Sequence, residues 1–266
     1  MQLKPIAETS PLDNRFYYVA NFETMLRTLQ RRDGDLLSAE EGGFIREFFS
    51  VPQVSRALLV RMLMRRGPLF RAARLNYREI PQPIAAAQPL LERGWIDPTP
   101  TMTLAEVFGI FTKAEVAVRL VVGGFEAKVS KRLLLESLLM RWPDARPLDA
   151  WLAPPEPVFK VAVANLCIRL QLMFFGNFRQ SLTDFVLATL GIVKYEGTGF
   201  EPHSRPFQTR AQVEHFFALY RCRQMLHEDR LPADIEPLLP PPIDGCEWLE
   251  DRRQKLHYRL ARQYER

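Results

Sequence analysis

Apolar residues in the first part of the chain recur at the three- and four-residue spacing of an amphipathic helix. The segment 44–49 holds three phenylalanines and an isoleucine in this pattern, which indicates a helix with one buried face. Ser38 and Glu41 have the spacing of a capping box, in which each side chain accepts a hydrogen bond from the other residue's backbone amide. Val51-Pro52 ends the pattern, because proline disfavours the helical conformation of the residue before it. We therefore predict a helix that begins at Ala39 and ends before this proline.

A second helix is predicted from about Gln53 to Arg66, and a tight corner follows it. Gly67 suits the left-handed position after a helix, and Pro68 suits the first turn of a next helix. Such a corner is typical of a helix-turn-helix joint. Tight corners also occur in all-α cores that bind no DNA, so both interpretations stay open on this evidence.

The middle of the chain changes to short helices in quick succession. Thr103 with Glu106 and Thr112 with Glu115 have the spacing of two more capping boxes, so a brief helix is predicted after each threonine. The leucine-rich segment 133–139 predicts a third helix that is preceded by basic residues. This pattern is similar to a SAP-type helix pair, although an ordinary helical hairpin with exposed lysines would have the same spacing.

The remaining elements follow from proline-rich breaks and further helical patterns. A proline-rich boundary at 142–157 is followed by a buried helix from near Phe159. Next come a helix capped by Ser181 and a short strand at 192–195 with wing-like turns. A helix capped by Thr209 reaches about His227, and a proline-rich linker at 232–242 leads to an exposed charged helix from Trp248 to Arg266.

The composition adds the class of protein and a preference for anionic partners. Of the 266 residues, 47% are apolar and 25% charged, as in a globular chain. The net charge of +5 favours nucleic acid or an anionic membrane surface over a basic partner. No apolar run reaches the roughly 20 residues of a membrane span, and the start has no signal-peptide pattern. The three cysteines are too far apart for a paired zinc motif and too few for an even disulfide set. We expect a cytoplasmic protein with no membrane partner.

Basic residues concentrate in two segments. Seven arginines lie between Ser55 and Glu79 with no acidic residue among them, and arginine forks bind phosphate with two hydrogen bonds. Three further cations lie at the start of the leucine-rich helix. The alternative is a solvated surface, since helical spacing does not place all of the arginines on one face. The candidate DNA-binding residues are Arg56, Arg61, Arg65, Arg66, Arg71, Arg74, Lys128, Lys131 and Arg132, and Arg78 completes the arginine set.

The sequence contains one pattern that resembles a nuclease site. Asp97, followed at a distance by Glu126-Ala127-Lys128, copies the D…E-x-K lettering of metal-dependent nucleases. Those residues belong on adjacent strands, whereas here they fall between capped helices. The chain also has no G-x-x-x-x-G-K-S/T phosphate loop, which argues against an ATPase. We assign no catalytic and no metal-binding residue to this chain.

Four segments resemble the bacterial Fanconi-associated nucleases of the VRR-NUC family. They are FYYVANF (16–22), ALLVRMLMRRGPLFRAARLNYREI (57–80), MFFGNFRQSLTDFVLATLGIVKYE (173–196) and EWLEDRRQKLHYRLARQYER (247–266). The resemblance implies the N-terminal half of such a protein, without its nuclease domain. In that family an N-terminal helical region and a SAP-like module bind branched or 5′-flapped DNA. A helical-repeat domain follows, and a C-terminal VRR-NUC domain cuts with Mg²⁺ or Mn²⁺.

The resemblance and the pattern together predict a mainly α chain in four parts. These are an N-terminal helical, helix-turn-helix-like domain (1–98), a SAP-like module (99–150), a helical region with a winged-helix-like end (151–235), and a linker with the first helix of a helical-repeat, TPR-like domain (236–266).

The function that the resemblance implies is structure-selective DNA binding within a DNA repair nuclease. The full-length protein would be an endonuclease and 5′ exonuclease of the phosphodiesterase I type that acts in interstrand crosslink repair. The expected partners are branched or 5′-flapped DNA and the protein's own helical-repeat and VRR-NUC domains. No cofactor is expected in this chain, and Mg²⁺ or Mn²⁺ is expected for the nuclease domain. The alternative is a basic helical scaffold for protein interactions that has no nucleic-acid role.

Overall fold

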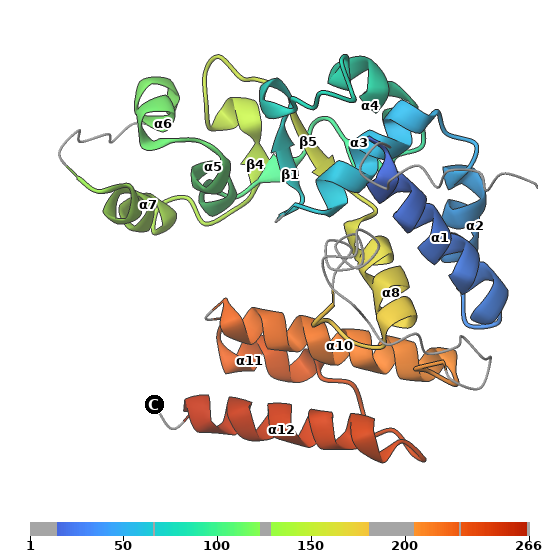
Figure 1. The fold of residues 1–266 in the computed structure, drawn as a ribbon. Coiled ribbons are helices and arrows are strands. Elements are labelled where there is room, and N and C mark those ends of the chain that lie inside the picture. Colours follow the sequence, from blue (N-terminus) through green and yellow to red (C-terminus); the bar gives the residue numbers. More distant parts are fainter. Residues whose placement is uncertain (1–14, 66, 123–128, 181–204, 229, 265–266) are drawn as a thin grey trace, which may run out of the picture. The chain divides into compact units, whose positions relative to one another are not determined.

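The computed structural model describes residues 15–65, 67–122, 129–180, 205–228 and 230–264. These residues are mainly helical, as predicted, and the chain divides into two compact units. The first unit comprises residues 1–20 and 50–165, and the second comprises residues 21–49 and 166–266. Helix α1 (Tyr17–Arg32) therefore contributes to both units (Figure 1).

The first unit contains a small antiparallel sheet with helices beside it (Figure 1). Strand β5 (Val158–Val161) lies between β1 (Leu69–Arg71) and β2 (Ile96–Asp97), so it joins segments that are far apart in the sequence. Helices α3 (Gln53–Leu63) and α4 (Pro83–Glu92) pack against each other, and α4 also contacts β2. Helices α3 and α4 thus pack together beside this small sheet.

The predicted helix-to-helix corner at Arg66-Gly67-Pro68 is wrong in its second half. Gly67 has a φ of +82°, as expected after a helix end, but strand β1 and the short 3₁₀ helix Ala72–Arg74 follow it instead of an α-helix. The Pro68 carbonyl accepts a hydrogen bond from the Val161 amide at 2.8 Å. This long-range pairing commits the chain to the sheet, and local sequence does not reveal it.

The predicted buried helix from near Phe159 is also corrected at its start. Residues 158–161 form the central strand β5, with Phe159 opposite Phe70 and Val161 opposite Ile96. The helix, α8 (Ala164–Phe175), begins three residues after the strand ends. The first compact unit continues to residue 165 and so includes this strand.

The remainder of the first unit is a module of short helices. It consists of β3 (Thr101–Met102), α5 (Leu104–Ile110), α6 (Lys113–Arg119), α7 (Lys131–Leu139), β4 (Arg146–Pro147) and the 3₁₀ helix Leu148–Ala150. Both predicted capping boxes are confirmed, at Thr103 and at Thr112. The indole of Trp151 is fully buried in the core of the module, and its Nε1 donates to the Met102 carbonyl at 2.6 Å. This core also includes Leu69 of β1 and Val158 of β5, so the module packs on the sheet of the first unit.

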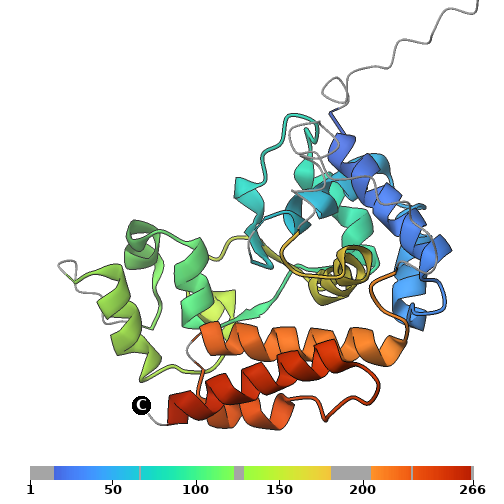
Figure 2. The same cartoon turned by 60° about the horizontal axis from the view of Figure 1, so that its bottom comes forward.

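The second unit is helical in all of its described elements. It contains α2 (Ala39–Phe48), most of α8, α10 (Arg210–His227), α11 (Pro232–Ile235), the 3₁₀ helix Glu236–Leu238 and α12 (Glu247–Tyr264). Helices α11 and α12 pack along α10, as both views show (Figures 1 and 2).

Three predictions for the second unit can be compared with the structure. The start of α2 at Ala39 and the helix capped by Thr209 are confirmed. The segment 232–242 is more than a linker, because it contains α11 and a 3₁₀ helix. Helix α12 is only partly exposed, since its leucines at 249, 256 and 260 are buried. The predicted helix capped by Ser181 and the strand at 192–195 lie outside the described residues.

Within the described residues, no helix is both long enough and apolar enough to cross a membrane.

Candidate nucleic-acid interface

Arg61, on helix α3, is held inside the first unit. Its Nε donates to Glu79 Oε1 at 2.8 Å, and its guanidinium lies over the Tyr18 ring, 4.1 Å from the centroid. Burial disfavours the charged form of Glu79, but the hydrogen bonds from Arg61 and others outweigh it and lower the pKa of Glu79. The Tyr18 hydroxyl donates to the same carboxylate at 2.9 Å. Arg61 is therefore paired with a carboxylate and an aromatic ring of its own unit, although 30% of its side chain is exposed.

Arg71, at the end of strand β1, is the centre of an ion-pair network. Its NH2 lies 2.8 Å from Glu115 Oε1 and donates to Glu156 Oε2 at 3.0 Å, and only 9% of its side chain is exposed. Arg119 also pairs with Glu156 at 3.0 Å. The Arg71 guanidinium lies over the Phe111 ring, 4.3 Å from its centroid. Arg71 thus connects the sheet to the α5–α6 module, which is a structural role.

The carboxylate of Glu115 has two functions in this network. It completes the capping box of α6 by accepting from the Thr112 amide at 2.8 Å, and it also accepts from Arg71 NH1 at 2.9 Å. The hydrogen bond from Arg71, followed by those from Thr112, holds the pKa of Glu115 well below its usual value. The carboxylate is therefore charged at neutral pH and fixes α6 relative to β1.

The other predicted arginines differ in exposure. Arg65, Arg74 and Arg78 are exposed. Arg65 donates to the Tyr77 hydroxyl at 3.3 Å, and Arg74 lies 3.5 Å from Glu115 with 66% of its side chain exposed. Arg56 is half-buried, and Arg66 lies outside the described residues. Three of the described arginines between 56 and 78 are therefore accessible to a phosphate backbone.

The basic start of helix α7 is divided in the same way. The Lys131 Nζ donates to the carbonyl of Phe111, the residue that caps the C-terminus of α5, at 2.7 Å, so this carbonyl has a hydrogen-bond partner. Arg132 is 85% exposed and forms an ion pair with Glu136 one turn later, at 2.9 Å. Lys128 lies outside the described residues. Arg132 is consequently the accessible cation among the described predicted residues of this helix.

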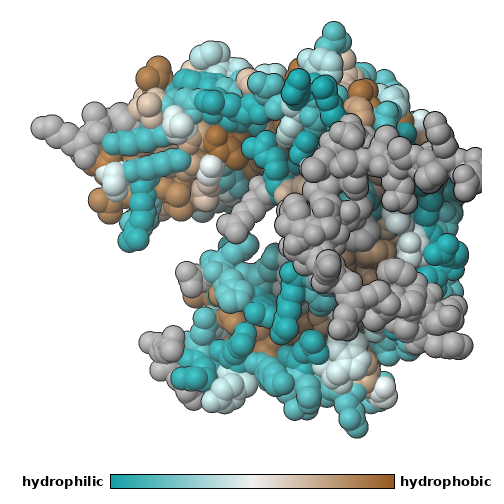
Figure 3. Space-filling view, viewed as in Figure 1, coloured by the Kyte–Doolittle hydropathy of each residue, from teal (hydrophilic) through white to brown (hydrophobic). Residues whose placement is uncertain are grey.

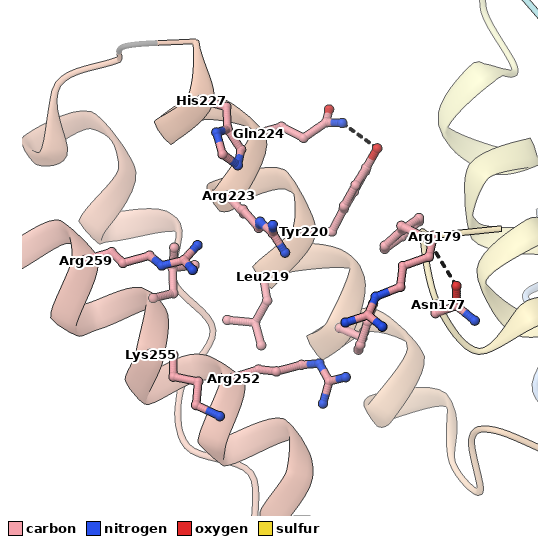
Figure 4. A pocket seen from close by; sticks show the side chains of 13 residues that line it. Asn177, Arg179, Leu219, Tyr220, Arg223, Gln224, His227, Arg252, Lys255 and Arg259 are labelled. Carbon is pink, nitrogen blue, oxygen red and sulfur yellow. Dashed lines mark hydrogen bonds between the residues drawn. The ribbon is translucent and has the colours of Figure 1, made fainter. Parts of the chain in front are cut away.

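A groove in the second unit was not predicted from the sequence. It has a volume of about 580 Å³ and is lined by α10, α12 and the residues after α8 (Figure 4). We call it the α10–α12 groove. Its basic residues are Arg179, Arg223, Arg252, Lys255 and Arg259. The signal that was available is the spacing of Arg252, Lys255 and Arg259 at i, i+3 and i+7, which places these cations on one helix face.

The described residues contain no group of three His, Cys, Asp or Glu side chains that could hold a metal ion. Of the D…E-x-K pattern, Asp97 lies in β2 and accepts from the Thr99 amide at 2.9 Å. Glu126 and Lys128 lie outside the described residues. The described side chains thus do not fit the Mg²⁺ or Mn²⁺ that the nuclease chemistry implies, and we derive no step through such an ion.

Two family models match the N-terminal part of the chain. The model "FAN1, HTH domain" matches residues 16–97, and "Fanconi anemia-associated nuclease SAP domain" matches residues 101–151. The chain belongs to the Fanconi-associated nuclease family. The first match covers helices α1 to α4 with strands β1 and β2, and the second covers the module of short helices with Trp151.

Relatives and solved structures extend the likeness beyond these two domains. The Fanconi-associated nuclease 1 homolog of Pseudomonas aeruginosa is 41% identical over 264 residues, which are 98% of this chain and 47% of that protein. The homolog of Arabidopsis thaliana is 27% identical over 84% of this chain and 26% of its own length.

Crystal structures described as paFAN1 bound to 5′-flap DNA with a gap match with TM-scores of 0.87 and 0.85, at 42% and 41% identity. They cover 95% and 98% of this chain, and this chain covers 47% of each. The chain therefore spans about half the length of the Pseudomonas relative and of the paFAN1 chains, and corresponds to their N-terminal part.

Proposed function

We propose that this chain is the DNA-binding portion of a structure-selective nuclease that acts on 5′-flapped or branched DNA. The observation that supports this most is the TM-score of 0.87 over 95% of the chain to a paFAN1 structure bound to 5′-flap DNA. The exposed Arg65, Arg74, Arg78 and Arg132 fit this role, because cations on a surface neutralise phosphates and release counterions.

The cutting reaction belongs, on this proposal, to a VRR-NUC domain of the full-length protein. Hydrolysis of a phosphodiester needs a cation that activates water and polarises the phosphate, and we propose Mg²⁺ or Mn²⁺ for that domain. The full-length protein would be an endonuclease and 5′ exonuclease in DNA repair, including the repair of interstrand crosslinks. The residues of this chain would bind the DNA and orient it for cleavage.

Binding of the purified chain to fluorescent DNA tests the proposal. We expect tighter binding to a 5′-flapped duplex than to an unbranched duplex of the same length and composition. We also expect the affinity to fall steeply with salt, because phosphate contacts release counterions. Equal, weak binding to both DNAs at low salt would contradict the proposal and favour a protein-interaction scaffold.

A further inference from the structure

The α10–α12 groove presents an unusual concentration of free positive charge. Arg223, Lys255 and Arg259 are exposed, and they form no ion pair with any described residue. Arg252 donates to the Trp248 carbonyl of its own helix and is likewise without a carboxylate partner among the described residues. The side chains of the described residues that line the groove include no aspartate or glutamate. Such like charges repel one another unless an anion neutralises them.

The cations come from separate elements but share one hollow. Arg223 lies on α10, Arg252 and Lys255 on α12, and Arg179 after α8 (Figure 4). Hydrophilic residues cover much of the visible surface of α10 and α12 (Figure 3). Leu219 and Leu256 form the apolar floor beneath the charges and belong to the packing between these helices. The groove is therefore formed by packed helices, and the backbone positions of Arg223, Arg252 and Lys255 are set by these helices.

Aromatic rings line one end of the same groove. Phe178 stacks on Tyr220 with centroids 3.6 Å apart and an interplanar angle of 21°, and both rings are only half-buried. Proteins that bind nucleic-acid strands combine basic grooves with aromatic rings of this kind, since cations track the phosphates and rings contact bases or sugars. A purely structural cation cluster would not need partly exposed, stacked rings beside it.

We propose that the α10–α12 groove binds the sugar–phosphate backbone of a DNA strand, as a contact separate from those of the helix-turn-helix and SAP domains. The inference rests on the proposed DNA-binding function. The two matched domains end at residue 151, whereas every described residue that lines the groove lies between 177 and 259. The groove would add to the affinity through backbone contacts and would not read base sequence.

The test compares two double charge reversals in the full chain. The groove variant combines Arg223→Glu with Arg259→Glu. The control variant combines Arg221→Glu with Arg230→Glu, which changes the net charge equally at exposed positions that do not line the groove. Binding to a fluorescent 5′-flapped DNA is measured by anisotropy between about 50 and 200 mM salt. Thermal melting confirms that both variants are folded.

We expect the groove variant to bind about tenfold more weakly than the control and to lose about two units of salt slope, one for each phosphate contact removed. Hydroxyl-radical footprinting of the wild-type chain should also show protection of Tyr220 when DNA is bound. Equal losses in the two variants, or no protection of Tyr220, would overturn the groove proposal. Failure of the wild-type chain to bind any DNA would instead overturn the proposed function itself.

Discussion

At the scale of single residues, the arginines between 56 and 78 have two different roles. Arg61 and Arg71 are enclosed by carboxylates and aromatic rings of their own unit. Arg65, Arg74 and Arg78 are exposed, and none of them is enclosed in this way. Arginines that look equivalent in the sequence therefore have different roles: some stabilise the fold, and others, on our proposal, bind DNA.

Replacing Arg65, Arg74 and Arg78 together with alanine should weaken binding to every DNA sequence tested. Each lost phosphate contact reduces the salt slope by about one, so the slope should flatten by up to about three units. The melting temperature should change little, because exposed charges contribute little to folding. If anisotropy titrations show an unchanged salt dependence, these arginines do not contact phosphates and are only a solvated surface.

Arg71→Ala should act on stability instead. It leaves Glu115 with only the exposed Arg74 and Glu156 with Arg119 alone, so we expect a loss of about 2 kcal/mol in the free energy of unfolding. The matched control is Arg74→Ala at the more exposed pair, for which we expect less than about 0.5 kcal/mol. Urea denaturation measures both. Equal effects would show that the Arg71 network is not a structural link.

At the scale of the element, Arg132 is an accessible cation among the described residues at the start of helix α7, where the helix dipole favours phosphate. Arg132→Ala should reduce DNA affinity to the same extent for all base sequences. Glu136→Ala is the matched control, because it removes the partner of Arg132 and should leave affinity unchanged or raise it. Competition binding with DNAs of different sequence checks this, and a sequence-specific loss would contradict a backbone role.

The cap of helix α2 predicts a pH dependence. Glu41 is fully buried, and it accepts from the Ser38 amide, Arg169 and Arg210. Burial raises its pKa, but these hydrogen bonds outweigh burial and lower the pKa below its usual 4.5.

The folded pKa of Glu41 thus lies below the unfolded one, so its stabilising effect is complete above the unfolded value and is lost as the pH falls through the folded value. Glu41→Gln should lower stability at neutral pH and flatten the decline of the melting temperature below pH about 4.5. A decline as steep as that of the wild type would assign the acid sensitivity to other groups.

At the scale of the whole molecule, we expect DNA binding and cutting to separate. The purified chain should bind flapped DNA and release no product with Mg²⁺ or Mn²⁺, because arginines and lysines position a phosphate backbone but do not generate hydroxide. Gel analysis of end-labelled DNA measures this. Cleavage that disappears in Glu126→Gln or Lys128→Ala would place a real nuclease site at the D…E-x-K pattern. Cleavage that survives both changes would point to a contaminating enzyme.

The sequence by itself determined the local features of this protein. The capping boxes at Ser38, Thr103 and Thr112 were predicted correctly, because a cap is formed by residues within one turn of each other. The mainly helical class and the family were also predicted from the sequence, since both depend on patterns of residues along the chain.

Only the tertiary structure decided how distant residues combine. The sequence pattern of 158–161 suits a buried helix or a strand, and pairing with β1 and β2 makes it a strand. Arg71 meets Glu156 across 85 positions of sequence, and the cations of the α10–α12 groove come from separate elements. Which charges become internal partners and which stay available to phosphate depends on this packing, because an ion pair forms wherever the fold brings opposite charges together.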